Sequence, residues 1–271
     1  MNPIRHFLLA LQFFTRIPLP GRVAAWVGFD KDMQRASLAY FPLVGWLVGG
    51  VAAVAFVVVE ALLPAVSGAG WAAALLSTAL TVMLTGAFHE DGLADTADGL
   101  GGAVSRERAL EIMKDSRIGS YGASALVLAL LLKTAFIGVL AQVDVALVAV
   151  TLFAAHVCSR MMPIFIVALL PNVGGRADSK SAATASEAGG TILAVAIFWT
   201  VLVLVIAYRW HAGMFWLGGV AASGLAWFIM FGLLRRRLQG FTGDTLGATQ
   251  QVCELAFYFG VLVSLHFGGA A

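Results

Sequence analysis

The sequence predicts an all-α polytopic membrane protein, in which a bundle of about seven transmembrane helices follows an N-terminal amphipathic or re-entrant helix. Three observations predict this class. Of the 271 residues, 60% are hydrophobic and 12% are charged, whereas a soluble domain carries about 25% charged residues. The mean hydropathy is +0.90. The apolar residues also gather in long runs, and about 20 such residues are enough to cross a bilayer.

The N-terminal segment, residues 3–20, is expected to form the amphipathic or re-entrant helix. It carries Arg5 and Arg16 with apolar residues between them, and no clear small-residue cleavage site follows. Pro18 and Pro20 interrupt it, and it is too short to be read as a span. We therefore expect a segment that is retained at the membrane interface, and not a cleaved signal peptide.

Seven apolar runs are predicted to span the membrane. The first, at about 38–62, is rich in glycine, which allows helices to approach closely. The second, at about 71–88, ends at an acidic motif. The others cover about 123–141, 145–170, 191–208 and 213–234, and a last one follows Ala248 and ends at about 267. Residues 171–190 have the composition of a mobile loop. With no repeat or domain boundary evident, residues 1–271 are expected to form one integral-membrane domain.

The basic residues orient this bundle. If the N-terminus is cytoplasmic, fourteen Lys and Arg residues, Arg176 and Lys180 included, fall on the cytoplasmic side and only Arg209 falls on the far side. Cytoplasmic loops of membrane proteins carry such an excess of basic residues. We therefore expect a multi-pass protein of the bacterial cytoplasmic (inner) membrane whose polar loops, and hence whose active face, are cytoplasmic.

An acidic motif follows the second predicted span. Glu90, Asp91, Asp95 and Asp98 lie within nine residues, and no Lys or Arg occurs between His89 and Arg106. In a helix, the three aspartates share one face, where they repel one another unless a cation lies between them. Mg²⁺ accepts carboxylate oxygens and completes its shell with waters and substrate phosphates. We therefore predict a Mg²⁺ site made of these four residues; the alternative is a solvated acidic helix end.

Two glycine-framed loops reach the same face. The first contains Asp115-Ser116-Arg117-Ile118-Gly119, in which a guanidinium group can grip phosphate and a glycine lets backbone N–H groups approach it. The second contains Thr242-Gly243-Asp244 and precedes a helix that carries Gln251 and Glu254. Asp244 is either a ligand or the cap of that helix. For the first loop, the alternative is an ordinary connection before a helix.

Charged and polar residues also lie inside the spans. Lys133 lies about ten residues into its span, and His156, Ser159 and Arg160 share one face of another. A charge at bilayer depth costs about 3 kcal/mol or more, so it usually has a partner and a function. We expect a polar wall facing the acidic cluster, where Arg160 and Lys133 neutralise phosphate and His156 handles a proton or a hydrogen bond. The alternative is that Arg160 pairs with a carboxylate and merely holds two helices together.

Acidic residues, basic residues and glycine loops together indicate metal-assisted phosphoryl transfer. At these residues the chain resembles the cobalamin synthase, or adenosylcobinamide-GDP ribazoletransferase, family. The resemblance rests on a combination of motifs: Phe14-Thr15-Arg16-Ile17-Pro18, Glu90 to Gly99, Ile112 to Gly119, Ser159-Arg160, Thr242-Gly243-Asp244 and Gly247-Ala248. Each motif alone is weak, whereas the combination is highly specific.

The resemblance implies a transferase of cobalamin biosynthesis. In its reaction, the 3′-hydroxyl of α-ribazole, or of α-ribazole 5′-phosphate, attacks the cobinamide-side phosphate of adenosylcobinamide-GDP, and GMP leaves. It implies Mg²⁺ held by Asp91, Asp95 and Asp98, one of which doubles as the base. His156 and Arg160 are expected to be catalytic. The expected substrate-binding residues are Asp115, Ser116, Arg117, Gly119, Lys133, Ser159, Thr242, Gly243 and Asp244. The bilayer is a partner and nucleic acid is not; a homo-oligomer or other enzymes of the pathway stay open.

Three alternatives compete with this interpretation. Intramembrane prenyltransferases hold Mg²⁺ with Asp-x-x-x-Asp clusters, but they normally carry two, and this chain has one strong cluster. CDP-alcohol phosphotransferases also use spaced aspartates, but their Ala-Arg element is missing after Asp91-Gly92. A transporter would place its charges near the membrane midplane and often shows inverted repeats, whereas here the acids lie at the end of a span.

Overall fold

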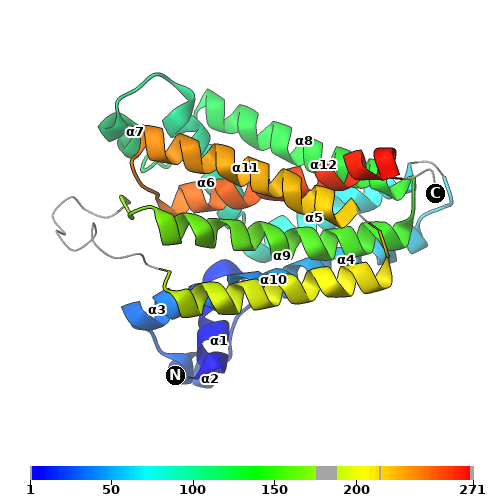
Figure 1. Cartoon of the computed structure of the whole chain (residues 1–271), viewed down its shortest axis with the longest axis horizontal. Helices are drawn as coiled ribbons and strands as arrows, with labels where there is room; N and C mark the ends of the chain where they lie inside the picture. Colours follow the sequence, from blue (N-terminus) through cyan, green and yellow to red (C-terminus); the bar gives the residue numbers. More distant parts are fainter. Residues whose placement is uncertain (1, 67, 175–187, 214, 269–271) are drawn as a thin grey trace.

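The computed structural model describes residues 2–66, 68–174, 188–213 and 215–268, and these residues form a helical bundle (Figure 1). Three short helices come first: α1 (Pro3–Phe14), α2 (Gly21–Val27) and α3 (Lys31–Ser37). The long helices that follow are α4 (Phe41–Leu62), α5 (Ala69–Thr85), α8 (Ser120–Ala141), α9 (Val145–Leu169), α10 (Gly190–Trp210), α11 (Phe215–Arg237) and α12 (Gly243–Gly268). Two helices, α6 (Phe88–Gly101) and α7 (Arg106–Ile112), lie between α5 and α8. The predicted all-α membrane class is confirmed.

The number of spans depends on one bend. Within the described residues, six helices are long and apolar enough to cross a membrane, and a seventh crossing is obtained when α5 and α6 are counted together. These two helices meet at an angle of 88°. α5 has 17 residues, which is near the lower limit of a span. Figure 1 shows α1 near one end of the bundle and the last turns of α12 near the other, as an odd number of crossings requires.

The bend between α5 and α6 was not predicted. The second span was expected to reach residue 88, but α5 ends at Thr85, and Gly86 and Ala87 both adopt positive φ angles, 67° and 58°. The Arg16 side chain packs against Gly86, where a Cβ atom would overlap its guanidinium group. Since glycine adopts positive φ without strain, Gly86 both ends α5 and admits Arg16. The acidic motif therefore lies on a separate helix turned away from the span.

The polar segments gather at one end of the bundle. Figure 1 shows α1, α3, α6 and α7 at that end, with α1 lying across the direction of the long helices. Most of the 171–190 segment, including Arg176 and Lys180, lies outside the described residues. Its first part forms a parallel bridge between Asn172 and Phe241, in which Val173 N–H donates to the Phe241 carbonyl over 2.8 Å. This bridge fixes the start of α12 beside the end of α9.

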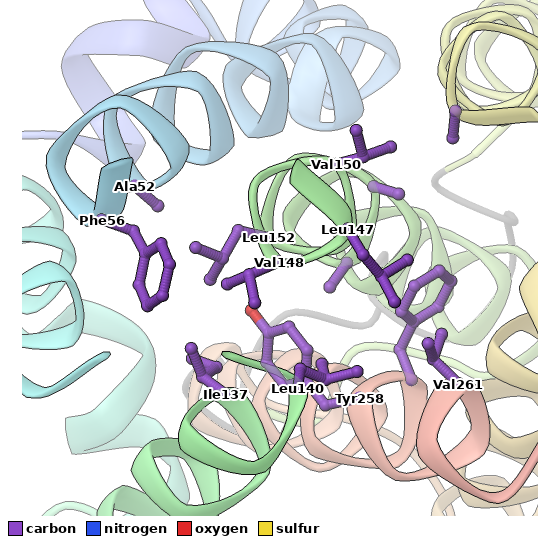
Figure 2. Packing of buried hydrophobic residues seen from close by; sticks show 14 of the residues in the cluster. Ala52, Phe56, Ile137, Leu140, Leu147, Val148, Val150, Leu152, Tyr258 and Val261 are labelled. Carbon is purple, nitrogen blue, oxygen red and sulfur yellow. The ribbon is translucent and has the colours of Figure 1, made fainter. Parts of the chain in front are cut away.

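The opposite half of the bundle has an apolar core around α9. Figure 2 shows Phe56 of α4, Leu140 of α8, Leu147 of α9 and Tyr258 of α12 converging there. All four side chains are buried. Large apolar side chains elsewhere on the spans, such as Leu131, point outward, as expected for a lipid-facing surface. The core holds the long helices together while the other end carries the polar groups.

Candidate active site

Four aspartates from two helices form an acidic cluster. Asp91, Asp95 and Asp98 lie on α6, which confirms that the motif is helical. Asp244, in the first turn of α12, joins them, because the charges of Asp91, Asp98 and Asp244 all act on the Asp95 carboxylate. Asp91 is exposed and the other three are half-buried. The second glycine-framed loop, expected at the same face as the acidic motif, therefore lies near it in the structure; the binding role expected for Asp244 stays a prediction.

Glycines allow α6 and α12 to approach each other. A Cβ atom on Gly92 would lie 2.6 Å from the Asp244 carbonyl oxygen, and one on Gly247 would lie 3.3 Å from the His89 backbone. Carbon atoms this close to backbone atoms would force the helices apart. The two glycines thus set the separation between the aspartates of α6 and Asp244.

We expect Gly92→Ala to lower activity by about 10²-fold, because displacement of reacting groups by about 1 Å costs that much. The added methyl group has no flexible side chain to displace, since its nearest neighbours are backbone atoms of Asp244. Gly232→Ala on α11 is the matched control, because a Cβ atom there has nothing within 4 Å. The enzymatic rates of the two variants, measured in membranes, check this prediction. Equal rates in Gly92→Ala and Gly232→Ala would contradict it.

Asp98 has a second contact besides the cluster. Its two carboxylate oxygens accept hydrogen bonds from Gly119 N–H over 2.7 Å and from Gly122 N–H over 2.8 Å. These N–H groups belong to the first turn of α8, where carboxylates are favoured. A Cβ atom on either glycine would overlap the carboxylate. Asp98 therefore anchors the Asp115–Gly119 loop beside the cluster, and each of its oxygens keeps a lone pair.

The loop before α8 carries an ion pair. The Arg117 guanidinium donates to both oxygens of Asp115, with Nη2 lying 2.5 Å from Oδ2. This contact lowers the pKa of Asp115 to about 2 and raises that of Arg117. Both side chains are at the surface. The pair holds the guanidinium group outside the bundle, where a phosphate can reach it, while Ser116 lies exposed between the two residues.

Thr242, and not Asp244, caps α12. The Thr242 hydroxyl accepts from Thr245 N–H over 3.3 Å, and the Thr245 hydroxyl accepts from Thr242 N–H over 2.9 Å. This reciprocal pattern satisfies free donors at a helix start. The capping alternative for Asp244 is therefore not observed. The helix also begins at Gly243, so the predicted loop up to Ala248 was too long.

The buried charges of the spans surround Glu254 of α12. Lys133 Nζ lies 2.6 Å from Glu254 Oε1, and His156 Nδ1 lies 3.2 Å from Oε2. Gln250 donates to Oε2 over 2.6 Å, and the Tyr258 hydroxyl donates to Oε1 over 3.1 Å. All these side chains are buried. Glu254 is thus the counter-ion of Lys133. No role was predicted for Glu254, although an acidic residue inside an apolar run usually has a partner and a function.

The predicted polar wall forms, but it faces Glu90 on the inner side of α6. Arg160 donates from Nη1 to the His156 carbonyl over 2.8 Å and lies over the Phe41 ring. Glu90 accepts from Gln251 over 3.0 Å and interacts electrostatically with Lys133 and Arg160. It is buried, whereas Asp91 is exposed. The placement of Glu90 therefore favours a part in this network over the predicted part as a metal ligand.

Ser159 belongs to the same network, because its hydroxyl accepts from Gln250 over 2.9 Å. Lys133, His156, Ser159 and Arg160 are thus brought together, as predicted. The diphosphate-binding or catalytic roles given to them stay predictions, since each is almost fully buried.

The acidic cluster has no complete cage for a metal ion in the part of the chain that the structure describes. Among the described residues, no three His, Cys, Asp or Glu side chains converge closely enough to hold an ion by themselves. Mg²⁺ does not need such a cage, because it usually takes one or two carboxylates and completes its shell with water and substrate phosphates. Hard carboxylate oxygens with no basic side chain among them fit this mode. The residues present therefore fit Mg²⁺ bound together with a diphosphate.

A cavity that was not predicted from the sequence lies next to the acidic cluster. It has a volume of about 620 Å³ and is lined by parts of α1, α3, α4, α6, α9 and α12. Its lining includes Phe88 of α6, which lies one helical turn before Asp91, and Gly243 of α12, which precedes Asp244. Since residues one turn apart share a helix face, this part of the lining lies beside the acidic cluster.

The chain is similar to proteins of one enzyme family over almost its whole length. The family model described as cobalamin-5-phosphate synthase matches residues 6–262. An adenosylcobinamide-GDP ribazoletransferase of Polaromonas sp. is 51% identical, with 98% of this chain and 100% of the relative aligned. Proteins of the same name from Albidiferax ferrireducens and Shewanella baltica are 49% and 42% identical, with 97% and 95% of this chain and 99% and 93% of the relatives aligned. No solved structure matches the chain.

Proposed function

Because this chain belongs to the cobalamin-5-phosphate synthase family, we propose that it joins adenosylcobinamide-GDP to α-ribazole 5′-phosphate or α-ribazole, with Mg²⁺, and releases GMP. Family membership confirms the resemblance seen in the motifs, and it leaves the prenyltransferase, CDP-alcohol phosphotransferase and transporter alternatives without support. The observation that carries the proposal is the packing of α12 against α6, with the Asp244 backbone against Gly92, which brings Asp244 near the aspartates of α6 at the end of the bundle where the polar loops gather.

The reaction moves one phosphorus atom between two oxygens. The 3′-oxygen of the acceptor ribose forms a bond to the phosphorus on the cobinamide side, and the bond from that phosphorus to the bridging oxygen breaks. GMP leaves with the bridging oxygen, and the 3′-hydroxyl gives up its proton. A carboxylate of the cluster takes this proton, and Asp91 is the exposed one.

Asp91, Asp95 and Asp244 would hold Mg²⁺, which would supply positive charge to neutralise the diphosphate. Asp98, on α6, supports this set through the hydrogen bonds that it accepts from the start of α8. Arg117 is held by Asp115 next to the same helix start, so its remaining donors can bind a phosphate oxygen. Positioning and charge neutralisation supply most of the rate in phosphoryl transfer.

The proposal places the cluster at the cytoplasmic face of the inner membrane. The support is that α1, α3, α6 and α7 lie at one end of the bundle (Figure 1), and that this end carries most of the basic residues of the chain. An excess of basic residues marks the cytoplasmic side. Nucleotide substrates are also cytoplasmic, so the site is accessible to them there.

The proposed function is tested by GMP release. Membranes that contain the chain are incubated with adenosylcobinamide-GDP, acceptor and Mg²⁺; we expect GMP and the joined corrinoid in equal amounts. Removal of divalent cations with a chelator should abolish release, and added Mg²⁺ should restore it, because the aspartates cannot neutralise the diphosphate alone. Membranes without the chain are the control. GMP release that persists after chelation would contradict the Mg²⁺ requirement, and no release at any Mg²⁺ concentration would contradict the proposed function.

A further inference from the structure

The cavity beside the acidic cluster has the size of a nucleoside site. Its volume is about 620 Å³, within the range of about 300–1,000 Å³ that is usual for pockets of small organic ligands. A nucleoside or nucleotide fits this space. A corrinoid that carries a nucleotide is several times larger and does not.

Aromatic rings line the part of the cavity near α1 and α6. Phe13 and Phe88 are 48% and 38% exposed, and their rings meet edge to face at 5.6 Å. Behind them, Phe14 and Phe41 stack at 4.1 Å. Half-exposed aromatic rings inside a cavity are the surfaces on which planar bases stack. The cavity therefore offers a site for a flat aromatic base.

The rest of the lining has an apolar part and a polar part. Leu38, Ile164, Val167, Phe241 and Leu246 make up the apolar part, and the polar side chains other than His89 and Asn172 come from α3: Lys31, Asp32, Gln34, Arg35 and Ser37. In a nucleoside, a benzimidazole has no hydrogen-bond donor and only one ring acceptor, because its other nitrogen is joined to ribose. It therefore leaves few polar atoms to be satisfied on the apolar part, whereas the polar α3 wall suits a ribose and a phosphate.

A basic side chain stands at the rim. Lys31, on α3, lines the cavity and is exposed. No carboxylate among the described residues pairs with it within 4.0 Å, although Asp32 lies next to it in the chain. An ammonium group at the rim of an apolar site suits a phosphate on the ligand.

We propose that this cavity is the acceptor subsite and that it binds a benzimidazole nucleoside 5′-phosphate. The base lies against Phe13 and Phe88, the 5′-phosphate binds Lys31, and the ribose hydroxyls face the acidic cluster. This proposal rests on the proposed function and identifies which of the two substrates occupies the cavity. The larger corrinoid substrate then approaches the cluster from outside the cavity, past the Asp115–Gly119 loop.

The test measures binding of the acceptor to the full chain in lipid nanodiscs by equilibrium dialysis. The ligands are α-ribazole 5′-phosphate and α-ribazole. Phe13→Ala and Phe88→Ala should weaken binding of both by about 5- to 100-fold, the range for loss of base stacking. Lys31→Gln should weaken binding of the 5′-phosphate by about tenfold and leave binding of the nucleoside unchanged. In the transfer assay, the same variants should raise KM for the acceptor and not KM for adenosylcobinamide-GDP.

Phe29→Ala and Arg22→Gln are the matched controls. Both side chains are exposed near the same end of the chain, and neither lines the cavity, so they should bind as the unchanged chain does. Unchanged acceptor binding in Phe13→Ala and Lys31→Gln would overturn the proposal, and so would displacement of the acceptor by GMP. If the acceptor binds as expected but no GMP is released, the subsite stands and the proposed function fails.

Discussion

Replacement of Asp91 by asparagine should lower GMP release by at least about 10²- to 10³-fold, which is the loss when one group that stabilises transition-state charge is removed. Asparagine keeps the size of the side chain and removes its charge. Asp91 is the most exposed member of the cluster and its charge acts on both Asp95 and Asp244. The same loss is expected for Asp95→Asn. Initial rates at saturating substrates and Mg²⁺ measure this effect.

The matched control for these variants is Glu107→Gln. Glu107 is exposed on α7, near the same end of the bundle, and its only ion pair among the described residues is a 4.0 Å contact with Arg106. Its loss should leave the rate unchanged. Both aspartate variants should also insert in the membrane and unfold like the unchanged chain, because neither side chain is paired with a basic group in the described residues. An active Asp91→Asn enzyme would remove Asp91 from the site.

Loss of Glu254 should be the most destabilising single charge removal in the chain. Glu254→Ala leaves Lys133 buried without its counter-ion, and removal of one partner of a buried ion pair costs about 3–5 kcal/mol. Lys133 lies 2.6 Å from Glu254 and both side chains are almost fully buried. We expect the free energy of unfolding in detergent, measured by denaturant titration, to fall by this amount.

Two further variants test whether the lost stability comes from breaking a buried ion pair or from removing a charge as such. The double variant Lys133→Met with Glu254→Gln removes both charges, so most of the lost stability should return. Glu111→Gln breaks the exposed Arg108–Glu111 pair, whose atoms lie 2.9 Å apart, and it should cost no more than about 1 kcal/mol. A Glu254→Ala variant as stable as Glu111→Gln would contradict the account of the network.

The helices could be predicted well from the sequence because apolar runs and polar breaks alternate along it. The bend at Gly86 and Ala87 could not, since hydropathy continues through it and only backbone geometry separates α5 from α6. The start of α12 was also placed too late. There, Thr242 and Thr245 form a reciprocal cap inside a stretch whose glycines suggested a loop.

The acidic cluster was predictable in part. Spacing alone placed Asp91, Asp95 and Asp98 on one helix face, but it could not place Glu90, which neighbours Asp91 in sequence and faces the buried network. The position of Asp244 beside them depends on the Gly92 and Gly247 contact between α6 and α12. Such a contact joins segments about 150 residues apart in the chain, so no local pattern shows it.

For the same reason, neither the partner of Lys133 nor the proposed acceptor cavity could be predicted from the sequence. Glu254 was visible as an acid in an apolar run, but its pairing with Lys133 requires α8 and α12 to be neighbours. The cavity draws on six helices, and Lys31 and Phe88 come together only after the chain folds. Long-range packing therefore decides which polar residues meet, whereas composition decides only that they need partners.

The account depends on carboxylates of α6 that bind Mg²⁺ together with the diphosphate of the substrate. GMP release measured against Mg²⁺ concentration, in the unchanged chain and in Asp95→Asn, tests this most directly. We predict that the residual activity of Asp95→Asn needs a markedly higher Mg²⁺ concentration to reach half its maximum. A rate that falls while the half-maximal Mg²⁺ concentration stays the same would contradict the account.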